Sequence, residues 1–265
     1  MTRDYLSKVP QATIGFWIIK IVATTLGEAG GNALSLTLEL GYLWGSIIFG
    51  VPLVAAVIAQ IRAKEFNRFL YWATITLTTL AGTTLADFFD RSLGIGYAGG
   101  SLALFTLVVI SLGIWKATLG SIDIKTVHTP KAELFYWITI MFSQTLGTAL
   151  GDWLADSSGL GYKGSALLIG AILSVIVALW YRTKISHVLL FWAAFILTRP
   201  LGATIDNSLD KAPAQGGLGI NDLVITAALA AIMIVCLFVI PQKAEQRHTS
   251  EEPQGAEEPL PQQTH

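Results

Sequence analysis

Four copies of one pattern of twenty residues restrict the fold of this chain more than any other feature. The copies occupy residues 15–34, 70–89, 135–154 and 190–209, and they align without a gap. Each contains an aromatic residue followed by Trp and, ten residues after the Trp, a Gly. The tryptophans are Trp17, Trp72, Trp137 and Trp192, and the glycines are Gly27, Gly82, Gly147 and Gly202. The first two copies relate to the last two by a constant offset, as expected of a unit that was duplicated twice.

A second, cleaner apolar run follows each copy, at residues 42–60, 100–115, 164–181 and 223–240. A membrane-spanning helix needs about 20 apolar residues, with a lower limit near 17. The composition, with 53% apolar and 13% charged residues, lies outside the usual range of soluble domains. We therefore predict an all-α integral membrane protein with eight transmembrane helices. These form four tandem two-helix repeats at residues 14–60, 69–115, 134–181 and 189–240.

The basic residues predict the orientation of these helices. Twelve of the 17 Lys and Arg residues lie before the first span, between repeats or after the last span. The positive-inside rule then puts both termini, residues 1–13 and 241–265, in the cytoplasm. The tail 241–265 is rich in Pro, Glu and Gln and is predicted to be disordered. The tryptophans, at the cytoplasmic end of each first helix, are expected to be membrane-interface anchors.

The first helix of each repeat carries a polar stripe, whereas the second helices carry none. The stripe positions follow one another by three or four residues, which keeps them on one helical face. Lipid disfavours such groups, so the stripes are expected to face one another or a water-filled cavity. We therefore expect the four polar first helices inside and the four apolar second helices in a lipid-facing ring. The stripes are Thr24, Glu28, Asn32 and Ser35; Thr79, Thr83, Asp87 and Asp90; Gln144, Thr148, Asp152 and Asp156; and Arg199, Asp206, Asn207 and Asp210.

Arg199 is the one basic residue of the stripes, and Pro200 follows it directly. An uncompensated arginine at the centre of a membrane helix costs about 3 kcal/mol even on lenient insertion scales. Pro200 removes one backbone hydrogen bond and frees the carbonyl of Ile196. We predict that Arg199 pairs with Glu28, the acid closest to it in predicted depth, where the helix is locally opened. A static pair that fixes helix packing and a pair that opens during function are both compatible with this pattern.

The repeats resemble a group of bacterial membrane-anchored proteins that are built from four tandem two-helix repeats with a signature Trp, catalogued as a repeat of unknown function. The resemblance covers residues 8–242 and is carried by "FWIIKIVATTLGE", "TIMFSQTLGTALGDW" and "FWAAFILTRPLGAT". It implies an architecture and a bacterial inner-membrane location, but no mechanism. The stripe has Asp87 and Asp152 in the middle repeats but Asn32 and Asn207 at the same point of the outer ones. A fourfold ring of carboxylates is therefore absent.

Buried carboxylates in membrane helices point to transport. We expect an exporter of a hard divalent metal cation such as manganese, because carboxylate, hydroxyl and amide oxygens suit Mg²⁺, Mn²⁺ or Ca²⁺. The same carboxylates suit protons as a coupling ion. The expected partners are the lipid bilayer and a small ion, and no cofactor is expected. The expected metal ligands are Glu28, Asp87, Asp152 and Asp206, and the wider ion-binding set adds Asn32, Thr83, Thr148 and Arg199.

Two other functions are compatible with the sequence. Arg199 also suits a carrier of small anions, and the acidic tail suits a non-transporting assembly or partner protein. An enzyme is not expected, because "GGLGIND" puts Asp222 two residues too late for an intramembrane aspartyl protease and no HExxH occurs. A net charge of −1 without a basic stripe argues against nucleic-acid binding. Because no GxxxxGK[ST] motif occurs, transport would need a gradient or a separate subunit.

Overall fold

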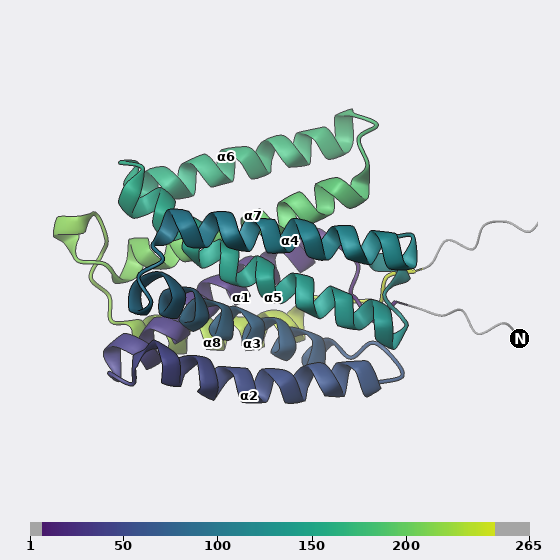
Figure 1. The fold of residues 1–265 in the computed structure, drawn as a ribbon, viewed down its shortest axis with the longest axis horizontal. Coiled ribbons are helices and arrows are strands. Elements are labelled where there is room, and N and C mark those ends of the chain that lie inside the picture. The colour runs from purple at the N-terminus through teal and green to yellow at the C-terminus, as the bar shows by residue number, and fades with distance from the viewer. Residues whose placement is uncertain (1–6, 247–265) are drawn as a thin grey trace, which may run out of the picture.

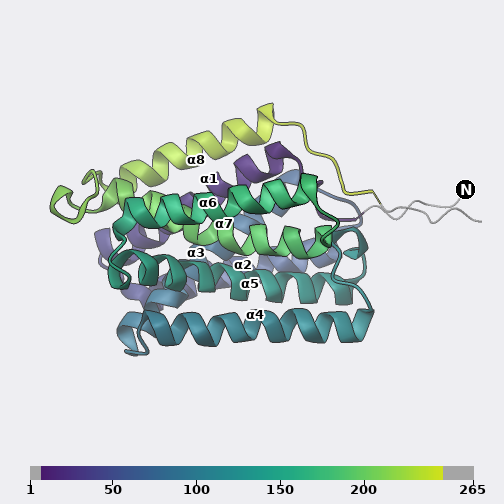
Figure 2. The ribbon, with the colours of Figure 1, turned by 90° about the horizontal axis from the view of Figure 1, so that it is seen from above.

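The computed structural model describes residues 7–246, and this part of the chain is all-helical, with eight α-helices and no strand. The helices are α1 (Ile14–Asn32), α2 (Gly41–Arg62), α3 (Arg68–Asp87), α4 (Tyr97–Leu119), α5 (Pro130–Asp152), α6 (Gly161–Arg182), α7 (His187–Asp210) and α8 (Asp222–Val239). Each predicted repeat corresponds to two of these helices. All eight run along the long axis of the molecule (Figures 1 and 2).

Local sequence signals set the helix ends. Side chains at the N-caps accept hydrogen bonds from backbone N–H groups that have no partner inside the helix. The caps of this kind are Thr13, Asn67, Thr129 and Asn221, which precede α1, α3, α5 and α8. At their other ends α1, α3 and α5 each continue into a π-helical turn (Ala33–Thr37, Phe88–Ser92 and Trp153–Ser157). The helix α7 has no such turn, so the fourth repeat departs from the other three at this end.

The four first helices form a closed ring, in which α1 contacts α3, α3 contacts α5, α5 contacts α7, and α7 contacts α1. Each second helix packs mainly against one member of this ring. It does so with the first helix of the next repeat, so that α2 packs on α3, α4 on α5 and α6 on α7, and α8 closes the circle on α1. At least half of the residues of α1, α3, α5 and α7 are buried, whereas few of α2, α4, α6 and α8 are.

Helices α2, α4, α6, α7 and α8 are long and apolar enough to cross a membrane. The second helices α2, α4, α6 and α8 expose many large apolar side chains, including Val51, Leu102, Leu167 and Val235. A soluble monomer rarely exposes apolar surface on this scale. By helix length and composition, the chain is therefore a membrane protein.

Three of the four repeated tryptophans lie in the core, which corrects their prediction as membrane-interface anchors, and the partly buried Trp17 packs against them. Trp72, Trp137 and Trp192 are 0–4% exposed and belong to one aromatic cluster with Phe16, Tyr71, Tyr136, Phe191 and Phe195. The Tyr71 and Tyr136 hydroxyls are 2.6 Å apart. Because the ring helices converge here, the indoles fill the space between them and leave no room for lipid. The aromatic cluster thus closes one end of the ring.

The two terminal segments meet at this closed end. Ser7 N–H donates to the Glu245 carbonyl at 3.1 Å, and Glu245 N–H donates to the Val9 carbonyl at 2.9 Å. The Trp72 indole N–H also donates to Gln242. Residues 241–246 are therefore hydrogen-bonded to the bundle, although the sequence predicted disorder from 241 onward. The rest of that tail, 247–265, lies outside the described residues.

Candidate functional site

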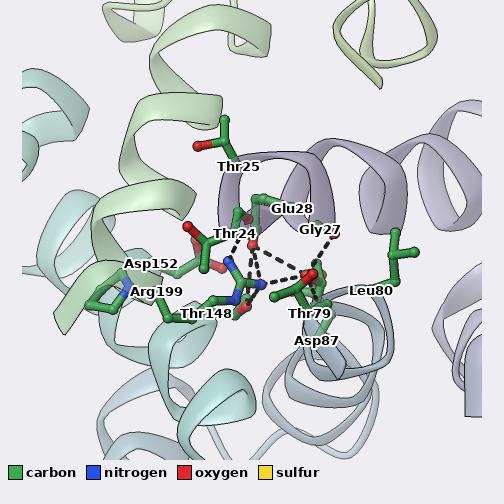
Figure 3. A network of polar contacts seen from close by, with 12 residues as sticks. Thr24, Thr25, Gly27, Glu28, Thr79, Leu80, Asp87, Thr148, Asp152 and Arg199 are labelled. Atoms are coloured by element: carbon green, nitrogen blue, oxygen red, sulfur yellow. Dashed lines mark hydrogen bonds and ion pairs between the residues drawn. The ribbon is translucent and has the colours of Figure 1, made fainter. Parts of the chain in front are cut away.

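Arg199 of α7 lies at the centre of the ring with no exposed surface. Its Nη2 is 2.8 Å from Glu28 Oε2 on α1, 2.5 Å from Thr83 Oγ1 on α3 and 2.6 Å from Thr148 Oγ1 on α5. Its Nη1 donates to the Thr24 carbonyl at 3.3 Å. Figure 3 shows Arg199 with Thr24, Glu28 and Thr148 around its guanidinium. The predicted pairing of Arg199 with Glu28 is confirmed. Each of the four repeats supplies one side chain to the hydrogen bonds around this pair.

The two threonines connect the charged groups. A hydroxyl can accept one hydrogen bond while it donates another. Thr148 accepts from Arg199 and lies 3.2 Å from Glu28 Oε2, to which it can donate. Thr83 lies between Arg199 and the carbonyl of Gly27, to which it is bonded at 3.0 Å. The central network, defined as Glu28, Thr83, Thr148 and Arg199, is therefore a closed set of charge-assisted hydrogen bonds without exposed members.

The repeated glycines make this close packing possible. On each ring helix the Gly faces the stripe residue seven positions after the Trp of the neighbouring ring helix. A Cβ at Gly27, Gly147 or Gly202 would lie 2.1–2.5 Å from that neighbour, which is too close for real side chains, and one at Gly82 would make a tight contact of 3.1 Å. Small residues commonly allow helices to approach in membranes. The four pairs are Gly27 with Thr79, Gly82 with Gln144, Gly147 with Arg199 and Gly202 with Thr24.

A second charged cluster lies beyond the central network, at the end away from the tryptophans. Arg91 Nε is 2.8 Å from Asp87 Oδ1, and Arg91 Nη2 is 3.1 Å from Asp152 Oδ2. Asn207 Nδ2 donates to Asp152 Oδ1 at 3.2 Å. The carboxylates are almost fully buried, whereas one third of the Arg91 side chain is exposed. Arg91 thus bridges two acids that the sequence assigned to an ion site, and it connects them to the surface.

Arg91 was not predicted to be a site residue, because its position in the sequence placed it in the loop between the two helices of the second repeat. The π-helical turn Phe88–Ser92 continues α3 past Asp87 and brings Arg91 back over the carboxylate. One signal was available, since Arg91 follows Asp87 by four residues, a spacing that favours an ion pair on a helix.

The four predicted metal ligands do not form one ligand set. Glu28 is paired with Arg199, and Asp87 and Asp152 are paired with Arg91. Asp206 lies fourteen residues after its Trp, one short of the Asp87 and Asp152 position. One residue turns a helix by about 100°, so Asn207 takes the place beside Asp152 and Asp206 faces elsewhere. Asn32 is 4% exposed and does not contribute a hydrogen bond to either described cluster.

Among the described residues, Asp206 groups instead with Asp210 and Asp222. One carboxylate oxygen from each lies within 4.8 Å of those of the other two. Asp206 has no exposed surface, and neither of its oxygens has a hydrogen-bond partner within residues 7–246. Asp210 and Asp222 were not among the predicted ligands.

Lys20 of α1 is a further buried charge, at the aromatic end of the ring. Its Nζ has no hydrogen-bond partner within the described chain and lies 4.2 Å from the centre of the Phe195 ring. Burial of an ammonium group without hydrogen bonds is costly, and a cation–π contact compensates only in part.

Lys20→Met is therefore expected to stabilise the protein by about 1–3 kcal/mol, the typical cost of an unsatisfied buried polar group. Met has a similar length and no polar atom to bury. Thermal unfolding of the purified protein measures the change, and the exposed Lys64→Met serves as the control. A lower unfolding temperature for Lys20→Met would show that the ammonium group contributes to stability.

Comparison with known families finds the four repeats. The family model described as Repeat of Unknown Function (DUF347) matches residues 15–66, 70–120, 135–186 and 190–241. Each match spans one first helix and the second helix that follows it. Searches among curated proteins and among solved structures gave no match.

Proposed function

The chain belongs to the family built from the Repeat of Unknown Function (DUF347), and we propose that it is a membrane transporter that exports a hard divalent cation such as Mn²⁺. In this proposal all eight helices span the membrane. The polar helices α1, α3, α5 and α7 surround the transport path, and α2, α4, α6 and α8 face lipid. The observation that carries the proposal is the fully buried network of Glu28 and Arg199, to which every repeat contributes.

The cost of this network supports a functional role. Charged groups in membrane helices are expensive, and they generally mark ion or proton pathways. A structural bundle needs no charges at its centre, since glycine-mediated packing holds such helices together. Here Glu28 and Arg199 pair at the centre of the ring, and Arg91 pairs with the buried Asp87 and Asp152 at its end, although apolar residues of similar size would fill the same volume.

The arginines act as tethered countercharges in the proposed mechanism. In this state Arg91 pairs with both Asp87 and Asp152, and Arg199 pairs with Glu28, so each of these acids has an arginine partner. One arginine for two aspartates leaves a net charge of −1 in the Arg91 cluster. A divalent cation can replace Arg91 between the two aspartates, because both offer hard carboxylate oxygens. The displaced Arg91 moves toward the solvent that already reaches one third of its side chain. Protonation of Glu28 releases Arg199 in the same way and couples the two steps.

The two ends of the ring differ in a way that supports the proposed direction. The aromatic cluster closes the end that the basic residues assign to the cytoplasm. The partly exposed Arg91 lies at the opposite end. In the proposal this state is a carrier closed toward the cytoplasm, with its acids nearest the outside of an inner membrane, and the cation leaves past Arg91.

The proposal is tested in cells that lack the protein and are complemented with single variants. Wild type is expected to lower cellular manganese and to restore growth in high manganese. Glu28→Gln and Asp87→Asn are expected to export manganese at least about tenfold more slowly, because each removes a buried charge of the path. The matched control is Glu65→Gln, an exposed acid between α2 and α3. Full rescue by both site variants, or no effect of any divalent metal, contradicts the proposal. A small anion that separates the strains would favour the anion carrier instead.

A further inference from the structure

Three aspartates converge where the fourth repeat departs from the others. Asp206 and Asp210 lie one turn apart on α7, and Asp222 is the first residue of α8. One oxygen from each carboxylate lies within 4.8 Å of the other two. The loop between α7 and α8 therefore brings together acids that are separated in the sequence.

Within the described residues, few of the carboxylate oxygens of these three aspartates have a hydrogen-bond or ion-pair partner. Thr37 donates to Asp222 Oδ2 at 2.9 Å, and Lys211 Nζ is 2.7 Å from Asp210 Oδ2. Both oxygens of Asp206, with Oδ1 of Asp210 and of Asp222, are buried without a hydrogen-bond partner in the described part of the chain. Nearly all buried polar atoms in folded proteins have a partner. Four such oxygens in one place indicate that a positively charged ligand belongs among them.

Asp206 is the strongest indication, because it is the only one of the three with no exposed surface. Three carboxylates at this separation repel one another, and the repulsion is strongest where water is excluded. One lysine ion pair at the rim leaves most of it uncompensated. A divalent cation at the centre of the three oxygens would neutralise two charges and supply the missing partners.

We propose that Asp206, Asp210 and Asp222 form a binding site for a hard divalent cation. Such ions take six or more oxygen ligands, so three carboxylates and bound water complete the coordination sphere. The site lacks the sulfur and imidazole ligands that softer metals prefer. It joins α7 to α8, and it borders the Arg91 cluster because Asn207, next to Asp206, donates to Asp152. Binding here does not depend on the proposed function, since the site exists whether or not the chain transports ions.

The test is equilibrium binding of Mn²⁺ alone to the purified full-length protein, followed by electron paramagnetic resonance. Wild type is expected to bind Mn²⁺ saturably, and Asp206→Asn and Asp222→Asn to lower the affinity about tenfold or more, because each removes a carboxylate ligand. The control is Asp156→Asn, the exposed acid at the corresponding end of the third repeat. Asp222 is half-buried at a helix start, so its variant keeps the test available if Asp206→Asn does not fold.

The outcomes separate this site from the proposed function. No saturable binding by folded wild type, or unchanged binding by folded Asp206→Asn and Asp222→Asn, overturns the site even if cells export manganese. If these variants weaken Mn²⁺ binding but the protein exports no metal, the site is supported and the transport proposal is wrong. Equal loss in Asp156→Asn would show an unspecific charge effect and also overturn the site.

Discussion

Arg199→Met is expected to destabilise the protein by about 3–5 kcal/mol, the usual cost of leaving one member of a buried ion pair without its partner. The change removes the hydrogen bonds to Thr83 and Thr148 as well as the pair with Glu28. Unfolding of the purified protein in detergent, followed by circular dichroism, measures the loss. It is the largest effect expected of any single side chain, because Arg199 contacts all three other ring helices.

Two further variants show whether the pair is responsible. The double variant Glu28→Gln/Arg199→Met is expected to recover much of the stability, because it leaves no unpaired charge. Arg91→Met is expected to cost less, because one third of Arg91 is already exposed and water can enter the space that its guanidinium leaves beside the two buried acids. A double variant as unstable as Arg199→Met would mean that packing of the arginine, and not its charge, stabilises the ring.

Gly147→Val is expected to disrupt the central network and to reduce the amount of folded protein. A Cβ at Gly147 would collide with Cβ and Cγ of Arg199 and lie 3.1 Å from Cδ of Pro200. Overpacking of a core typically costs about 1–3 kcal/mol, and here the displaced guanidinium also loses its hydrogen bonds. Folded yield by size-exclusion chromatography and the unfolding temperature measure the effect.

Gly113→Val on α4 is the matched control, because nothing lies within 4 Å of a Cβ at that position. It makes the same substitution in a helix that has no neighbour at this point, and it is expected to leave yield and unfolding temperature unchanged. Equal losses in both variants would show that helix propensity, and not the approach of α5 to α7, accounts for the effect.

The repeat allowed the eight helices and the central pair to be predicted. Four copies with shared landmarks define where each ring helix begins, and the polar stripe defines which face is buried. Glu28 and Arg199 were matched by depth alone, because helix rise per residue is constant. Their neighbours Thr83 and Thr148 follow from the same register.

Sequence patterns did not predict the contacts that depend on loops, on non-α-helical turns or on how closely the helices approach one another. After α3, Arg91 pairs with Asp152 of α5 as well as with Asp87, and the four-residue spacing of Asp87 and Arg91 reports only the pair within the same segment. The contact between Asp210 and Asp222 depends on the path of the loop after α7, for which no repeated pattern exists. Burial of the tryptophans depends on how closely the ring helices converge, which the spacing of residues does not report.

Mn²⁺ flux into liposomes that contain only the purified protein tests the central claim most directly. The account predicts saturable flux for wild type and for Glu65→Gln, and at least about tenfold slower flux for Glu28→Gln and Asp87→Asn, because each loses a buried charge of the path. Folded wild-type protein that moves no Mn²⁺ with or without a proton gradient, or site variants as fast as wild type, would contradict it.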